Sequence, residues 1–492
     1  MIWEISPVRL NVAAFVVGMR ARGCLRAATA VLALVPVLAL VPVLALILGT
    51  ALPVRAVDVA GAPPCSENAL RAALEQLAPA GGSLAVACET DFAVNSPITV
   101  ADGISLTLSG SIQLTSSGNR FFVVEPGATL TLRDLTLTGA DVSGDGGAIS
   151  SAGRLTLDNV RLIDNSATQG GAVAATGTVR IDDSHFVGNQ AARGGAISIG
   201  AGATLTATTS TFVQNAASVE GGALYLAGSA TLTDTTWSAN DAPNAGAIRV
   251  LPKARAQMDE CLMRDGSSNS APALHNSGET DLNRCIITNM NTTADYGAVD
   301  NDGLLRITNT IFLDNKSVDA NSLHNHTVTT LNLSRVELTF VTFLGRAGNG
   351  LGEVINNGNL TMRNSVINSV ARYTCYQGDG VADPMPAFVS LGGNVLSDDN
   401  VNAALGCFFK NEASTDHFKG APLNVVEDTM GTLLVFPTAD SPAIDGAACI
   451  ATVTVDLRGV QRKQGNGCDS GAVETRPAET FFRMYLPTVT RR

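Results

Sequence analysis

An apolar residue recurs about every 25 positions through the middle of this 492-residue chain. The repeated positions are Leu137, Leu162, Phe186, Phe212, Trp237, Leu262, Ile286, Phe312, Phe343 and Val366. An acidic or amide residue often follows three positions later, namely Asn165, Asn189, Asn215, Asn240, Asp265, Asn289 and Asn315. Gly-Gly-Ala and an aliphatic residue precede them at 146–149, 170–173, 194–197 and 221–224. Two sequence motifs that recur with the same fixed period predict a solenoid, in which each repeat contacts only its neighbours.

Short apolar runs within one repeat predict strands. Ile197 and Ile199 alternate with a polar residue, and so do Leu205 and Ala207, which is the period of a strand with one buried face. Gly, Ser, Asn or Asp bounds each run, and this leaves no room for a helix. Three such strands per repeat predict an all-β, right-handed parallel β-helix with coils of about 25 residues, stacked about 4.8 Å apart.

The recurrent residues have physical roles in such a coil. A Gly pair permits a positive φ at a bend and the close approach of neighbouring coils. An Asn tolerates the left-handed conformation and can bond its own turn or its stacked copies. The apolar residues are expected to stack into a core ladder. The predicted ladder contains Leu162, Phe186, Phe212, Trp237, Leu262, Ile286 and Phe312.

The first residues predict export. A basic segment at 20–26 precedes an apolar run at 31–49, and Val54 and Ala56 occupy the small-residue positions of a cleavage site. We therefore interpret residues 1–56 as a secretory signal, with an uncleaved membrane anchor as the alternative. The net charge of −12 argues against a nucleic-acid partner. A secreted or cell-surface protein is expected.

The cysteines agree with an oxidising compartment. Cys261 and Cys285 each precede a ladder residue in adjacent repeats, so a strand spacing of about 4.8 Å would bring them within disulfide range. We predict this bridge, whereas the sequence leaves the pairing of the others open. These others are Cys65, Cys88, Cys375, Cys407, Cys449 and Cys468.

The two ends of the solenoid need caps, because an open coil exposes its core and strand edges. Ser66 followed by an amphipathic segment to Leu74 predicts an N-capped helix. The coils are expected to begin irregularly near Leu84, and the period is lost after about Ser369. The predicted divisions are an N-terminal cap at 57–95, a β-helix at 96–369, a disulfide-rich region at 370–475 that finishes the solenoid, and a tail at 476–492.

The repeats resemble those of the polymorphic outer-membrane proteins. The matching signature is Gly-Gly-Ala-Ile followed by Phe-x-x-Asn, as at 186–189, 212–215 and 312–315. The resemblance covers about residues 140–370 and implies a surface-exposed, adhesin-like β-helix at the cell outer membrane. The C-terminal region is similar to the choice-of-anchor Q domain. Its matching stretches are 392–398, 441–446, 456–459, Arg462 and 468–474, and they imply association with the cell envelope.

Candidate catalytic residues are sparse. Asp182-Asp183 and Asp398-Asp399 are adjacent acids, but the first pair falls at a repeat turn. His324 and His326 share one face of a strand, yet no further His or Cys is placed by the sequence to complete a metal site, so a solvated loop or turn is expected. Asp445, Asp456, Arg458, Asp469 and Glu474 could form an ion-pair network or a Ca²⁺ site, and the network is favoured. We predict no catalytic, cofactor or metal residues.

The predicted function is non-catalytic binding at a cell surface, with glycans or another cell as partners. The alternative is a polysaccharide lyase or glycoside hydrolase, which needs clustered acids and a base on one face of adjacent coils. A structural spacer is the third possibility. Converging acids and bases would indicate an enzyme, an exposed polar or aromatic ladder would indicate a binder, and neither would indicate a spacer.

Overall fold

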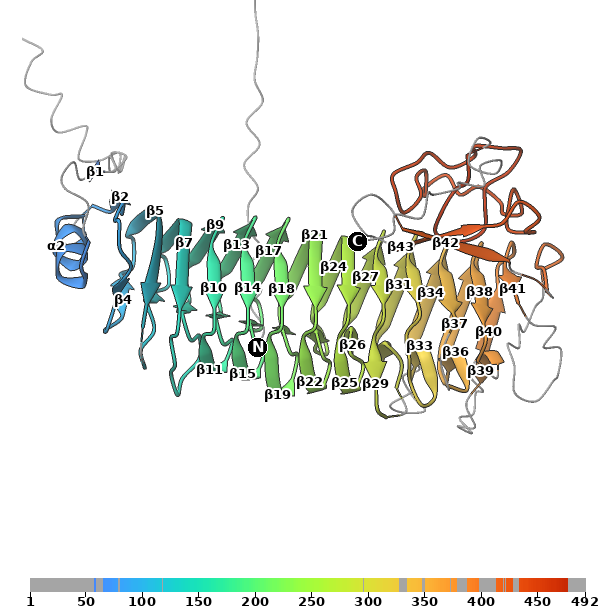
Figure 1. Cartoon of the computed structure of the whole chain (residues 1–492), viewed down its shortest axis with the longest axis horizontal. Helices are drawn as coiled ribbons and strands as arrows, with labels where there is room; N and C mark the ends of the chain where they lie inside the picture. Colours follow the sequence, from blue (N-terminus) through green and yellow to red (C-terminus); the bar gives the residue numbers. More distant parts are fainter. Residues whose placement is uncertain are drawn as a thin grey trace, which may run out of the picture. The chain divides into compact units, whose positions relative to one another are not determined.

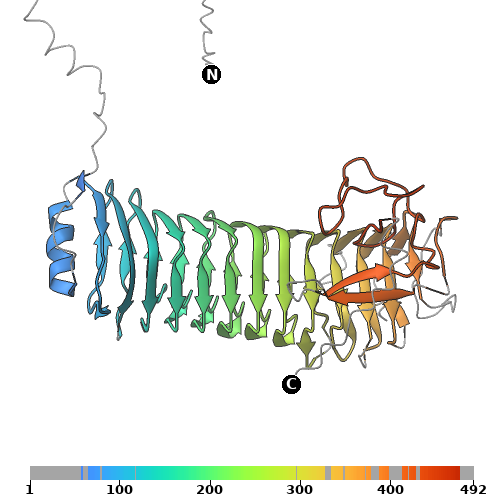
Figure 2. The same ribbon diagram turned by 45° about the horizontal axis from the view of Figure 1, so that its top comes forward.

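Parallel strands stack coil upon coil into a β-helix, and a smaller C-terminal region folds onto it (Figures 1 and 2). The predicted fold class is confirmed. The predicted signal at 1–56 and the tail from 477 lie outside the residues that the computed structural model describes. Among the described residues, no helix is long and apolar enough to cross a membrane. The described residues are 57–58, 65–77, 80–116, 118–294, 296–326, 334–346, 350–371, 373–377, 387–397, 413–418, 420, 422–427 and 433–476.

Three parallel sheets form the faces of the β-helix, and two of them consist mainly of short strands, one per coil. The narrow sheet contains β4 (Ile98–Val100), β6 (Phe122–Val124), β8 (Ile149–Ser151), β12 (Val173–Ala175), β16 (Ile197–Ile199), β20 (Leu224–Leu226), β23 (Ile248–Val250), β26 (Leu274–Asn276), β30 (Val299–Asn301), β33 (Ala320–Asn325), β36 (Gly352–Asn356) and β39 (Tyr373–Gln377). The short sheet contains β11 (Ser166–Gln169), β15 (Gln190–Arg193), β19 (Ala216–Glu220), β22 (Asp241–Asn244), β25 (Ser267–Ser270) and β29 (Asn291–Thr292).

The broad sheet receives one long strand or two short strands from each coil. It contains β1 (Val57–Asp58), β2 (Gly82–Ala85), β3 (Phe92–Ala93), β5 (Ser105–Thr115), β7 (Thr129–Thr138), β9 (Arg154–Asp158), β10 (Arg161–Ile163), β13 (Thr178–Asp182), β14 (His185–Val187), β17 (Thr204–Thr208), β18 (Thr211–Val213), β21 (Ser229–Ser238), β24 (Arg255–Arg264), β27 (Glu279–Asn283), β28 (Ile286–Thr288), β31 (Leu304–Thr308), β32 (Ile311–Leu313), β34 (Arg335–Thr339), β35 (Thr342–Gly345), β37 (Asn359–Arg363), β38 (Val366–Ser369), β40 (Ala387–Ser390) and β41 (Val395–Leu396).

Residues in the left-handed conformation bend each coil. Asp183 has a φ of 46° between the two broad-sheet strands of its coil, which confirms Asp182-Asp183 as a repeat turn. Asp398-Asp399 lies outside the described residues. At the other bend Gly170 has a φ of 60°, and a Cβ on Gly171 would lie 2.2 Å from the carbonyl oxygen of Gly195. The Gly pair therefore serves both a positive φ and a close approach.

The apolar ladder runs through the core beneath the broad sheet. Phe186 stacks on Phe212 with ring centroids 4.9 Å apart, and Phe212 stacks on Trp237 at 4.0 Å. The next coils continue the ladder with Met263 and Ile287, which pair in register with Trp237 and Phe312. The prediction that Leu262 and Ile286 belong to the ladder was therefore wrong by one residue. Ile367, in place of Val366, continues it in the same way.

A one-residue shift places a strand side chain on the opposite face of the sheet. Leu262 and Ile286 face away from the core, where an apolar side chain is not expected on a solvated sheet. They are apolar because the C-terminal region covers this face. Ile286 packs in a cluster with Val435 and Leu457 of that region. The sequence pattern alone could not separate a core position from a covered outer position.

Stacked Asn side chains form a hydrogen-bonded column at the next bend. The side-chain amide of Asn189 donates to Asn215 Oδ1 at 2.9 Å and to the carbonyl oxygen of Leu162 at 2.9 Å. The left-handed residue is the one before the Asn, such as Gln214 with a φ of 54°. The column is therefore built by bonds between stacked copies, and the left-handed bend falls one residue earlier. Asp265 and Asn289 occupy that bend position.

Disulfides cross-link the N-terminal cap, two adjacent middle coils and the C-terminal region. Cys261 and Cys285 are bonded with Cα atoms 4.4 Å apart, as their spacing predicts. They occupy a corner where several other coils carry Ser or Thr, such as Thr235 and Thr310. The structure also pairs Cys65 with Cys88 and Cys449 with Cys468. Cys375 is disulfide-bonded as well, while Cys407 lies outside the described residues.

An α-helix covers the first coil, as predicted. Helix α2 (Glu67–Leu77) begins after Ser66, whose Oγ accepts a hydrogen bond from the Ala69 N–H at 3.2 Å, and it buries Leu70. The stacked coils extend from β2 to β41, residues 82–396, and the short strand β1 pairs in parallel with β2.

The first part of the C-terminal region adds to the last coil, where His417 bridges Val395 of β41, and the later part folds back along the broad sheet (Figure 1). Its antiparallel hairpin of β42 (Leu423–Glu427) and β43 (Leu433–Pro437) contributes to the apolar cluster that covers this sheet. Ala472 N–H donates to Thr342 Oγ1 at 2.9 Å, and Ser470 Oγ donates to the Gly393 carbonyl at 2.6 Å. The C-terminal region thus covers the outer face of the broad sheet. Its apolar residues pack there against those of the solenoid.

A carboxyl group lies inside the late coils. The Glu353 side chain on β36 is fully buried and accepts hydrogen bonds from Asn321, Ser322 and Ser369 at 2.7–3.0 Å. Burial raises the pKa of Glu353, and these hydrogen bonds only partly oppose the rise.

Glu353→Gln is expected to raise the free energy of unfolding at neutral pH and to leave it unchanged in acid. The folded state keeps the Glu353 proton to a higher pH than the unfolded chain, whose carboxyl has the ordinary pKa of 4.5. Folding is therefore favoured fully below that value, and the wild type loses stability as the pH rises toward the folded pKa. The loss is about 1.4 kcal/mol per unit of pKa difference. Urea unfolding between about pH 4 and pH 8 measures it, and a gain that does not vary with pH would contradict the expectation.

Candidate functional site

Chemically active side chains line up on the outer face of the narrow sheet. In β20, β23, β26 and β30 the middle residue of three faces outward, and inter-strand pairing sets these residues in one row. The row continues into β33 with the same pairing. It consists of Tyr225, Arg249, His275, Asp300 and His324.

A second outer row lies two residues further along the same coils. Ser277, Asp302 and His326 follow the ends of β26, β30 and β33, and the backbone ladder continues through Asp302 and His326. The two rows bring five acids and imidazoles together, which we call the His–Asp cluster. Its members are His275, Asp300, Asp302, His324 and His326.

Short distances connect the cluster across three adjacent coils. His275 Nε2 lies 2.9 Å from Asp302 Oδ2 and 3.6 Å from Asp300 Oδ2. His324 Nδ1 lies 3.2 Å from Asp300 Oδ1, and His326 Nδ1 lies 3.0 Å from Asp302 Oδ1. Each carboxylate thus lies between two imidazole rings, one from the coil before and one from the coil after.

The cluster is strongly coupled electrostatically. Burial pushes the pKa of Asp302 upward, but hydrogen bonds and charge interactions with His275 and His326 outweigh burial and hold this pKa well below its usual range. The hydrogen bond to Asp302 raises the pKa of His326, against the effect of burial. Tyr296 lies beside the cluster, with its ring centroid 5.8 Å from that of His324. The arrangement can hold a cation or exchange a proton.

Charged and aromatic side chains extend the face toward the earlier coils. Glu220 pairs with Arg193 at 3.0 Å and with Arg249 at 3.1 Å. The Arg193 guanidinium lies 6.0 Å from the ring centroid of Tyr225. Burial, and then the charge of Glu220, raises the pKa of Tyr225. We call these four residues the Arg–Tyr group, and they adjoin His275 through Arg249.

The prediction that His324 lies in a solvated loop or turn was wrong, because His324 is buried on strand β33. The sequence placed no further His beside this pair, whereas His275, two coils earlier, contacts the same two carboxylates. His275, Asp300 and Asp302 were missed because they lie far apart in sequence. Reading the second residue after the Ala of each repeat motif would have found Tyr225, Arg249, His275 and Asp300 in a row.

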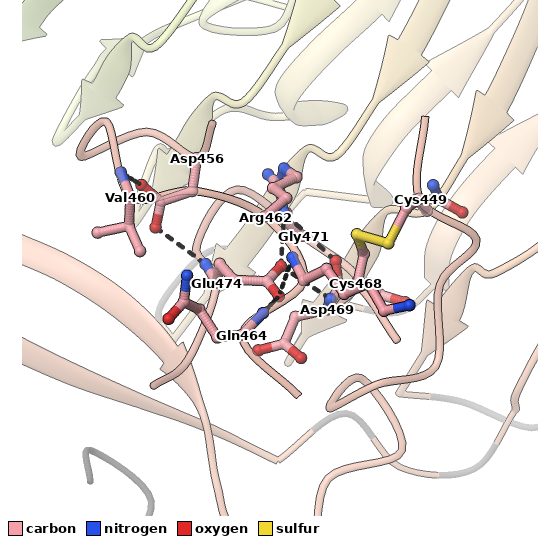
Figure 3. Close-up of polar contacts among 12 residues, drawn as sticks. Cys449, Asp456, Val460, Arg462, Gln464, Cys468, Asp469, Gly471 and Glu474 are labelled. Atoms are coloured by element: carbon pink, nitrogen blue, oxygen red, sulfur yellow. Dashed lines mark hydrogen bonds and ion pairs between the residues drawn. A yellow bond between two sulfur atoms is a disulfide. The ribbon is translucent and has the colours of Figure 1, made fainter. Parts of the chain in front are cut away.

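The C-terminal acids form a second cluster, which is structural. Figure 3 shows Asp456, Arg462, Asp469 and Glu474 joined inside the region by hydrogen bonds. The Glu474 carboxylate accepts hydrogen bonds from the backbone N–H groups of Lys463 at 2.8 Å and Asp469 at 3.0 Å. A guanidinium nitrogen of Arg462 lies 3.4 Å from Glu474 Oε2.

The other carboxylates of this cluster are satisfied in the same way. Asp456 accepts N–H groups from Arg458, Val460 and Glu474 at 2.8–3.0 Å. Asp469 accepts the Asp445 N–H at 2.8 Å. Arg458 pairs with Asp456 at 3.0 Å, which is the ion pair that the sequence favoured over a Ca²⁺ site, and protein donors occupy the oxygens of these carboxylates.

Comparisons with known proteins concern the fold. No protein-family model matches the sequence, and no curated protein matches it. A solved structure that superposes on the chain is a mutant of AlyGC, a PL6-family alginate lyase. The superposition has a TM-score of 0.36 at 10% identity and covers 86% of this chain and 60% of that chain. The chain therefore matches only about three fifths of the lyase's length.

Proposed function

We propose that this chain is an extracytoplasmic β-helical protein that binds glycans on the outer face of its narrow sheet. The observation that carries the proposal is the row of Tyr225, Arg249 and His275 on adjacent coils, with Arg193 and Glu220 beside it. An extended sheet repeats such groups at about 4.8 Å, which suits a linear polymer better than a compact ligand. Aromatic rings and paired charges supply stacking and hydrogen bonds to sugars.

The compartment belongs to the same proposal. Disulfides persist where the surroundings are oxidising, and the described residues contain three complete bridges. These bridges, with the predicted signal at residues 1–56, support a secreted or cell-surface protein. Attachment to a cell envelope through the N-terminal segment or the C-terminal tail, and an adhesin-like role, are parts of the proposal.

A glycan lyase or hydrolase is the second candidate, because acids and imidazoles converge across adjacent coils in the His–Asp cluster. Asp302 with His326, 3.0 Å apart, and Asp300 with His324, 3.2 Å apart, each bring a carboxyl group and an imidazole close enough for acid–base work. This convergence is the pattern expected of an enzyme, whereas the Arg–Tyr group is the polar ladder expected of a binder.

A glycan array combined with a depolymerisation screen, run with and without Ca²⁺, tests the proposal. Saturable retention of a polysaccharide without cleavage is the expected result. Release of unsaturated or reducing ends would replace the binding function with the enzymatic one. A protein that neither retains nor cleaves any polysaccharide would contradict both the binding and the enzymatic function. A structural spacer would then remain.

A further inference from the structure

We propose that the His–Asp cluster binds one divalent transition-metal ion through His275, Asp300 and Asp302. One ligand atom from each of these side chains lies within 4.8 Å of the other two, so a single ion can reach all three. The ligands come from β26 and from β30 with the residue that follows it, so the sheet itself fixes their spacing. This proposal rests on the cluster alone and does not require that the chain bind a glycan.

The first observation is an unsatisfied buried carboxylate. Asp300 is only 1% exposed, and neither of its carboxylate oxygens has a hydrogen-bond partner. Burying a charged group without such partners is costly, and native structures rarely leave one in this state. In contrast, the buried acids of the C-terminal network accept several N–H groups each. A bound cation would supply what Asp300 lacks.

The second observation is the orientation of His275. Its Nδ1 lies 2.8 Å from Asn244 Oδ1, so Nδ1 carries the hydrogen and donates it. The Nε2 atom then faces carboxylate oxygens of Asp302 at 2.9 Å and Asp300 at 3.6 Å. Either a hydrogen on Nε2, which makes the ring a cation, or a metal ion must lie between Nε2 and these oxygens. Ligating histidines in proteins commonly donate their other N–H to an oxygen, as His275 does to Asn244.

The outer two histidines support the ligands. His324 and His326 each approach the far oxygen of one carboxylate, at 3.2 Å from Asp300 and 3.0 Å from Asp302. The hydrogen bond between His326 and Asp302 fixes the orientation of that carboxylate, whereas the contact between His324 and Asp300 lacks the geometry of a hydrogen bond. They leave Asp300 Oδ2 and Asp302 Oδ2 directed at His275. The cluster therefore has an inner set of three ligands, with His326 as an orienting group and His324 packed beside Asp300.

The donor set indicates the class of metal. One imidazole nitrogen with two carboxylates suits zinc and other first-row divalent ions, whereas Ca²⁺ and Mg²⁺ prefer oxygen ligands alone. Two carboxylate charges also balance a divalent ion. The other positive charge that could satisfy the site is a proton on His275, which would make the cluster a set of ion pairs that binds no metal.

Titration of the metal-stripped protein with Zn²⁺ against a chromophoric chelator tests the proposal. We expect one tight Zn²⁺ per chain, with Ca²⁺ and Mg²⁺ unable to displace it. His275→Gln, Asp300→Asn and Asp302→Asn should each weaken binding at least about 10- to 100-fold, the usual cost of perturbing even an orienting group. His185→Gln is the matched control, because His185 lies on the broad sheet and bonds Thr211.

Each outcome decides the matter. Stoichiometric binding that all three variants lose and the control retains would support the site. Absence of tight Zn²⁺ binding by the wild type would overturn it and assign the charge to a proton on His275. Binding that survives Asp300→Asn and Asp302→Asn, or a preference for Ca²⁺, would also overturn it. Far-UV circular dichroism of each variant shows that the β-helix has formed, and two independent Asp variants guard against the misfolding of one.

Discussion

Phe212→Ala is expected to lower the free energy of unfolding by about 3–5 kcal/mol, the usual cost of removing a buried aromatic ring. Phe212 is fully buried and lies between Phe186 and Trp237 in the ladder. The neighbouring coils are held apart by their backbone hydrogen bonds, so they cannot close onto the cavity. The lost ring contacts therefore remain unreplaced on both sides.

Urea unfolding followed by far-UV circular dichroism measures this loss, and the fluorescence of Trp237 reports the ladder directly. Val213→Ala is the matched control, because Val213 is the next residue and faces outward, half-buried. The control should change the unfolding free energy by no more than about 0.5 kcal/mol. Equal effects of the two variants would contradict a core ladder at Phe212.

Arg462→Met is expected to cost about 3–5 kcal/mol and to loosen the C-terminal region from the β-helix. The Arg462 guanidinium donates to Asn309 Oδ1 of the solenoid at 2.6 Å and lies 3.7 Å from the ring centroid of Phe340. Burial lowers the pKa of Arg462 to about 10, against the attraction of Glu474 and other acids, so the group is still charged at neutral pH. Its removal leaves Glu474, which is fully buried, without its cation.

Limited proteolysis and urea unfolding measure the effect of Arg462→Met. Arg346→Met is the matched control, since Arg346 is half exposed and pairs with Asp314 near the surface. Such pairs contribute about 0–1 kcal/mol. Adding Glu474→Gln to Arg462→Met should recover part of the loss by removing the buried charge. If the control is as damaging as Arg462→Met, the buried network does not hold the region in place.

The repeat architecture could be predicted because the same sequence pattern recurs in each coil. The Gly pair at 170–171, the turn at Asp183 and the ladder residue Phe212 each obey a local rule of backbone geometry or side-chain size. The rules failed where a distant segment supplies the reason for a residue. Leu262 and Ile286 are apolar because residues after 420 cover them, and no local pattern contains that information.

The candidate site was harder to predict for a related reason. His275 and His324 are 49 positions apart, and only the register of the narrow sheet brings both beside Asp300. A single His-x-His motif gave no sign of the acids between the two coils. The motif alignment places these residues at one repeat position, but their burial and the unsatisfied oxygens of Asp300 emerge only in three dimensions.

The most direct test uses the polysaccharide that the wild type retains in the glycan screen. It measures the affinity of that polysaccharide for variants on the outer face of the narrow sheet. Tyr225→Ala and Arg249→Ala should each weaken binding about tenfold or more, because Tyr and Arg dominate the energy of binding surfaces. Arg133→Ala, an exposed position on the broad sheet, should leave the affinity unchanged. Losses confined to the first two variants would place the glycan on the narrow sheet. Equal affinities for all three variants and the wild type would contradict the central claim.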